Sequence, residues 1–123
     1  MNNVINEDMK VALRSILSMI NRSEKAQEKF SQGSSQHTLQ KNRINALKIS
    51  FSLIENALDN SILYNFKKNE FESAIAPLNS LISKSEKSKT KLKQGTWQHT
   101  MLSNNLKALN IALPLIMEEI DKR

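Results

Sequence analysis

The sequence predicts an all-α protein: a four-helix bundle made of two tandem-repeated antiparallel helical hairpins related by a pseudo-twofold axis. Three observations lead to this fold class. Apolar residues recur at helical spacing over most of the chain. Only two glycines and two prolines occur among 123 residues, so few tight turns are available to a sheet protein. The chain also repeats itself at a fixed offset, which indicates two copies of one structural unit.

The repeat is clearest in a short segment that occurs twice. Residues 32–38 read QGSSQHT, and residues 94–100, 62 positions later, read QGTWQHT. At this offset, 16 of the 39 positions in residues 20–58 are identical to their counterparts, without a gap, which is far more than chance gives. We therefore interpret residues 1–123 as a single domain, with one repeat unit at about residues 1–60 and the second at about residues 61–123.

The first helix of each unit is indicated by its apolar residues. They follow a 4-3-4 rhythm from Met9 in the first unit and from Phe71 in the second, with Asp8 and Asn69 as the expected N-caps. This rhythm places one apolar stripe on each helix, so both helices are expected to pack on a neighbour.

A glycine follows each of these helices and predicts where the chain reverses. Gly33 and Gly95 are expected to end the helices as left-handed residues after the last turn. Ser34 and Thr96 come next and are good N-caps for a following helix. The predicted turns are therefore two or three residues long, and the next helix folds back antiparallel.

The second helix of each unit is apolar on most sides, so a single neighbour cannot cover it. Asn42 and Asn104 are expected on its inner face. Two hairpins that pack face to face would cover both helices. The apolar connector at Ile62–Phe66 is expected either to pack across the end of the bundle or to continue the helix. A linker of about ten residues allows the two turns to lie at the same end or at opposite ends.

Composition removes several classes of function. The chain has no cysteine, so disulfides and thiolate metal sites are excluded. We expect no membrane-spanning segment and no signal peptide, and therefore a cytoplasmic protein. The net charge is +6, with a lysine-rich stretch at Lys84–Lys93 that is either a solvated helix face or a phosphate-binding surface.

A polar set recurs beside both predicted turns, and it is the candidate binding site. On two helices joined by a short turn these residues cluster within about three turns of the hairpin tip. The same set has a purely structural interpretation, in which Ser23 and Asn42 fasten the tip and Glu24 pairs with a nearby base. The candidate ligand- or partner-binding residues are Glu24, Lys25, Lys29, Gln36, His37, Glu86, Lys87, Lys91, Trp97, Gln98 and His99.

Two chemistries suit this set. The helix N-terminus at Ser35, Gln36 and His37 offers free N–H groups to an anion. Trp97 replaces Ser35 in the second copy, and an exposed tryptophan is a candidate for contact with a protein partner.

We predict no catalytic residue, no metal and no cofactor. Ser23 has no oxyanion loop, and the two histidines lack the spacing of a metal site. The expected function is a small non-enzymatic binding or regulatory module that acts through the tips on a protein partner, without a membrane, as a monomer or homodimer. The alternative is a phosphate-bearing ligand or nucleic acid at the basic tips, although few aromatic side chains are available for base stacking.

Overall fold

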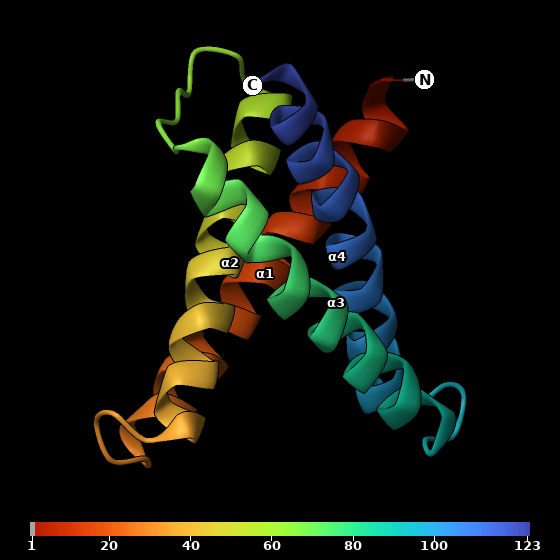
Figure 1. Ribbon diagram of the computed structural model, residues 1–123. Helices are drawn as coiled ribbons and strands as arrows, with labels where there is room; N and C mark the ends of the chain where they lie inside the picture. Colours follow the sequence, from red (N-terminus) through yellow and green to blue (C-terminus); the bar gives the residue numbers. More distant parts are fainter. Residues whose placement is uncertain (1) are drawn as a thin grey trace.

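The computed structural model describes residues 2–123 and contains four α-helices and no strand within that range. The helices are α1 (Asn2–Glu28), α2 (Ser35–Leu58), α3 (Lys68–Thr90) and α4 (Trp97–Lys122). α1 and α2 form one antiparallel hairpin, and α3 and α4 form the other (Figure 1). The predicted all-α four-helix bundle is confirmed. None of the helices in the described range combines the length and the hydropathy that a transmembrane segment requires.

Both hairpin turns lie at the same end of the molecule and are splayed apart (Figure 1). The start of α1, the end of α4 and the connector between α2 and α3 lie at the other end. The first helix of each hairpin packs on the second helix of the other, and α2 also packs on α4. Within residues 2–123, α1 and α3 do not approach each other closely. The same helices would pack on each other if the two hairpins exchanged places, which is what a twofold axis requires. The axis itself stays a prediction.

The core occupies the end of the bundle away from the turns. Its fully buried large side chains come from all four helices and would each contribute about 1.5–3 kcal/mol by leaving water. Buried alanines on each helix let the backbones come close together. The largest fully buried apolar residues are Phe71, Ile16, Leu47, Ile54, Leu78, Leu109 and Ile116.

Two predicted N-caps are wrong. α1 begins at Asn2, so Asp8 lies inside the helix, where its Oδ1 is 3.9 Å from Nζ of Lys107. α3 begins at Lys68, which also places Asn69 inside its helix. The reason is visible at Glu70, whose Oε1 accepts a 3.1 Å hydrogen bond from the backbone N–H of Lys67 and so satisfies the residue that precedes the helix.

The turns are longer than predicted, because α1 ends at Glu28 and α3 at Thr90, which leaves residues 29–34 and 91–96 between helices. Buried contacts stop well before the glycines, so little packing holds the last helical turns. Gly33 and Gly95 do have positive φ, 87° and 91°, but in a separate β-turn rather than at the helix end.

In each of these β-turns, the backbone N–H of the residue after the glycine closes the turn. The Ser34 N–H donates to the Ser31 carbonyl at 3.0 Å, and the Thr96 N–H donates to the Lys93 carbonyl at 3.3 Å. Among the described residues only the glycines have positive φ, so each is a type II turn with glycine at its third position.

The connector packs across the end of the bundle, which settles the choice left open by the sequence. The Tyr64 and Phe66 rings stack with centroids 6.2 Å apart. Both meet Phe71 edge-on, at 6.3 Å and 5.8 Å. Leu63 of the connector, by contrast, is 82% exposed.

Candidate functional site

The two hairpin tips extend beyond the core. We call residues 24–42 the first tip and residues 86–104 the second tip, and neither stretch contains a buried residue. The side chains of the tips are therefore not used by the core and are available for contacts outside the molecule.

The repeated Gln-His-Thr begins the second helix of each hairpin, as predicted. Ser34 and Thr96 are the N-caps: the backbone N–H of His37 donates to Oγ of Ser34 at 3.2 Å, and that of His99 donates to Oγ1 of Thr96 at 3.3 Å. The sequence predicts that the backbone N–H of His37 is free to bind an anion. In the structure this N–H already donates a hydrogen bond to Ser34. Both histidine side chains are half-buried.

The first tip presents mostly exposed polar groups. Glu24 pairs with Lys48 of α2 across the hairpin, as expected, with Oε2 and Nζ 4.0 Å apart. Both partners are exposed, so the pair contributes at most about 1 kcal/mol. Lys25, Lys29 and Gln36 are exposed and lie on the same tip.

The second tip carries the matching residues. Glu86, Lys87 and Lys91 are exposed, whereas Gln98 and His99 are half-buried. His99 and Glu86 line the same shallow depression, of about 390 Å³, at the junction of α3 and α4.

Trp97 is the main difference between the tips. Its side chain is 70% exposed at the first residue of α4. It lies at the edge of an open groove of about 450 Å³, whose opposite wall is formed by α1 at Val11 and Arg14. A large aromatic side chain beside an open groove is suited to contact with a partner.

The two tips do not come together into one site. They diverge at the same end of the molecule (Figure 1). Across the described part of the chain, no three His, Asp or Glu side chains gather as a metal site would need. The tips therefore form two separate surfaces of similar composition.

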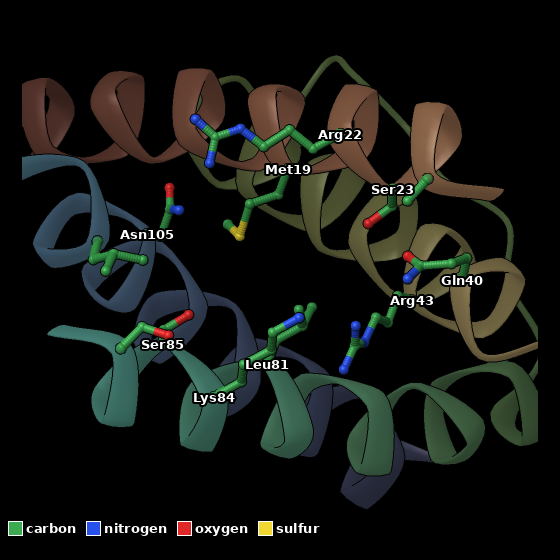
Figure 2. Close-up of a pocket in the computed structure, with 12 residues that line it drawn as sticks. Met19, Arg22, Ser23, Gln40, Arg43, Leu81, Lys84, Ser85 and Asn105 are labelled. Atoms are coloured by element: carbon green, nitrogen blue, oxygen red, sulfur yellow. The ribbon is translucent and has the colours of Figure 1, made fainter. Parts of the chain in front are cut away.

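A cleft of about 220 Å³ lies between the hairpins, where α1 and α3 stay apart (Figure 2). All four helices contribute to it. Its twelve lining residues form six pairs whose members are 62 positions apart, so matching positions of the two repeats face one space. The pairs are Met19 and Leu81, Arg22 and Lys84, Ser23 and Ser85, Ala26 and Ser88, Gln40 and Leu102, and Arg43 and Asn105.

The cleft is positively charged. Arg22, Arg43 and Lys84 line it, and no aspartate or glutamate does. Arg22 also donates a hydrogen bond to the thioether sulfur of Met101. Lys84 belongs to the lysine-rich stretch, which continues from the cleft along α3 as an open surface that includes Lys87 and Lys91.

Arg43 is the most unusual of these cations, because it is only 7% exposed. Its Nη2 donates a long 3.4 Å hydrogen bond to Oγ of Ser80 on α3, and its Nε is buried without a partner. Burial lowers the pKa of the Arg43 guanidinium, but arginine remains protonated in proteins. Arg43 thus brings a fixed positive charge to the wall of the cleft, while its Nε is enclosed by protein atoms without a partner.

The prediction that Asn42 and Asn104 face inward is wrong. Asn42 is exposed and Asn104 half-buried, while the next residues, Arg43 and Asn105, are buried. The two asparagines that are identical between the repeats lie one residue before the buried face of each helix. A usable signal was present in the spacing, because residues 43, 47, 50 and 54 all lie on one face at 4-3-4 intervals.

A second buried charge, Glu119, lies on α4 at the end away from the tips and was not predicted. Its Oε2 and Oε1 accept hydrogen bonds at 3.1 Å from Lys122 and Arg123. Burial by itself would raise the pKa of Glu119, but hydrogen bonds from Tyr64, Lys122 and Arg123 outweigh it and lower the pKa. Burial and the bond to Glu119 also raise the pKa of Tyr64. This cluster ties the connector to α4.

Comparison with known proteins identifies no relative. No family model, no curated protein and no solved structure matches the chain. Since a four-helix bundle serves many unrelated functions, the function has to be inferred from the tips and the cleft themselves.

Proposed function

We propose that this protein is a small, non-enzymatic binding or regulatory module of the cytoplasm that binds a protein partner through its two tips. The observation that supports this proposal is that residues 24–42 and 86–104 contain no buried residue, although they carry the repeated polar set. Residues that do not stabilise the core are available for recognition, and loops and helix ends at the edge of a rigid scaffold are common places for it.

Trp97 provides the anchor of the proposed interface. Buried tryptophans at interfaces often contribute 2 kcal/mol or more, roughly thirtyfold in affinity, because they remove a large apolar surface from water. The side chain is already 70% exposed, so it is accessible without a change of fold. Glu86 and Lys87 are exposed on the same tip, and charged side chains of this kind favour one partner over others.

The splayed arrangement suits a partner that contacts both tips. Because they diverge at the same end (Figure 1), a partner segment placed between them reaches both hairpins at once. Two linked contacts raise the affinity above that of either one.

Site-specific photocrosslinking in the native host tests this proposal. A photoreactive amino acid at position 97 or 36 is expected to give the same discrete protein adduct, and Trp97→Ser, which introduces the residue found at position 35, should reduce the adduct from position 36. The matched control is position 63, because Leu63 is an exposed apolar residue of the connector, and the connector lies at the opposite end. Equal adducts from positions 97 and 63 would contradict the proposal.

The alternative partner is a phosphate-bearing ligand or nucleic acid. Three lysines favour this alternative, because they line one open depression of about 440 Å³ along α3 and at its end: Lys84, Lys87 and Lys91. Retention on heparin that falls steeply with salt supports this alternative. Absence of retention at low salt removes it and leaves the protein partner.

A further inference from the structure

We infer that the cleft between the hairpins is a separate binding site for a small organic anion. The phosphate or carboxylate head of that ligand is held by Arg43, and its apolar body rests on Met19 and Leu81. Eight of the twelve lining residues, among them Arg43, Met19 and Leu81, lie outside the tips, and the site does not depend on a protein partner.

The charge of the cleft selects an anion. Three helices each bring one cation to its wall, Arg22 from α1, Arg43 from α2 and Lys84 from α3. None of the lining residues is acidic, so the cations are not neutralised inside the cleft. A concave surface lined by one sign of charge concentrates ions of the other sign.

Arg43 provides the specific contact. A buried charged group normally has every donor satisfied, because removing it from water is costly otherwise. Here Nε has no partner, and the one hydrogen bond from Nη2, to Ser80, is 3.4 Å long. Figure 2 shows the guanidinium extending from α2 toward α3, in the space between the hairpins. The terminal nitrogens of a planar guanidinium are suited to an anion with two oxygens.

The rest of the wall suits an amphipathic ligand. Ser23 and Ser85, both buried, bring hydroxyl groups from α1 and α3, and the Asn105 amide comes from α4. Met19 and Leu81 supply apolar surface. The volume of about 220 Å³ corresponds to roughly seven water molecules, which admits a small molecule.

Amide NMR titration of the full-length protein tests this inference with phenyl phosphate, benzoate and neutral benzyl alcohol. We expect saturable shifts for at least one anion at residues lining the cleft, on all four helices, and weaker shifts for benzyl alcohol. Tighter binding of phenyl phosphate assigns a phosphate head, and equal or tighter binding of benzoate assigns a carboxylate head. Unsaturable shifts, or shifts spread over surface lysines, would overturn the proposal.

Two variants and one control locate the head group. Arg43→Met should weaken anion binding about tenfold or more, the loss that corresponds to one charge-assisted hydrogen bond. Lys84→Met, at an exposed position that the fold does not need, should weaken it by a smaller factor. Lys41→Met removes the same charge from an exposed site of α2 outside the cleft and should leave the affinity unchanged. Equal loss in Lys41→Met and Arg43→Met would show a nonspecific charge effect and refute the site.

Discussion

Arg43→Met should make the protein more stable, although it removes the most buried cation. Arg43 is 7% exposed, its Nε has no partner, and no carboxylate pairs with it among the described ion pairs. Replacement of such a poorly compensated charge by an apolar side chain of similar length removes a desolvation cost. Methionine keeps most of the aliphatic stem and adapts to irregular space.

The magnitude follows from the two contributions that change. A charged donor that is buried and unsatisfied costs about 1–3 kcal/mol or more. The lost hydrogen bond to Ser80 is long, at 3.4 Å, and Ser80 is exposed, so water replaces it at little cost. We therefore expect Arg43→Met to raise the free energy of unfolding by about 1–3 kcal/mol.

Urea unfolding at neutral pH measures this change, because the midpoint should rise while the slope stays constant. The control Lys41→Met, which loses the same charge from an exposed position, should lie within about 0.5 kcal/mol of the wild type. Destabilisation by Arg43→Met of 1 kcal/mol or more would refute the reasoning, because it would mean that the guanidinium is well compensated in the folded protein.

Three other variants test separate parts of the structure. Glu119→Gln should lower the free energy of unfolding by about 1–2 kcal/mol at pH 7. Because the pKa of Glu119 in the folded protein lies below the ordinary 4.5, the stabilisation by its carboxylate is present above pH 4.5 and is lost as the pH falls through the folded pKa. Urea unfolding at several pH values measures this, and a difference in free energy of unfolding between wild type and variant that does not change with pH would contradict the prediction. Gly33→Ala should cost about 1 kcal/mol from its φ of 87° alone, since an added Cβ meets no atom within 4 Å; an unchanged melting temperature speaks against this strain. Leu78→Ala should cost about 2–5 kcal/mol by calorimetry, and a loss below 1 kcal/mol would place Leu78 outside the core.

The sequence predicts the helices and the core well, because their signals are local and periodic. Ile16 and Leu78 occupy matching places in the 4-3-4 rhythm, and both are fully buried. The positive φ of Gly33 and the cap at Ser34 were also predictable, since each depends on the chemistry of one residue.

Features that depend on packing between distant segments were not predictable. The common end of the two turns depends on the connector, where Tyr64 and Phe66 pack on Phe71, and linker length alone allowed both arrangements. The length of the turns depends on where buried contacts stop along the hairpin, which the glycines do not reveal.

The candidate site was predicted in part. The polar set does lie at the two tips, and Ser23 is buried beside the first of them. The cleft was missed, because its residues are spread over four helices and become neighbours only when the hairpins pack. Because Asn42 and Asn104 are identical between the repeats, they were predicted to be the inward-facing residues, whereas Arg43, one residue further along, is the buried one.

The unfolding of residues 1–60 alone, compared with the intact chain, tests most directly whether the two hairpins stabilise each other through one shared core. α2 packs on both α3 and α4, so removal of the second hairpin exposes buried side chains such as Leu47 and Ile54. We predict that the fragment shows no cooperative urea transition as a monomer, and that any folding depends on its concentration through self-association. A concentration-independent transition with the midpoint of the intact protein would contradict the shared core.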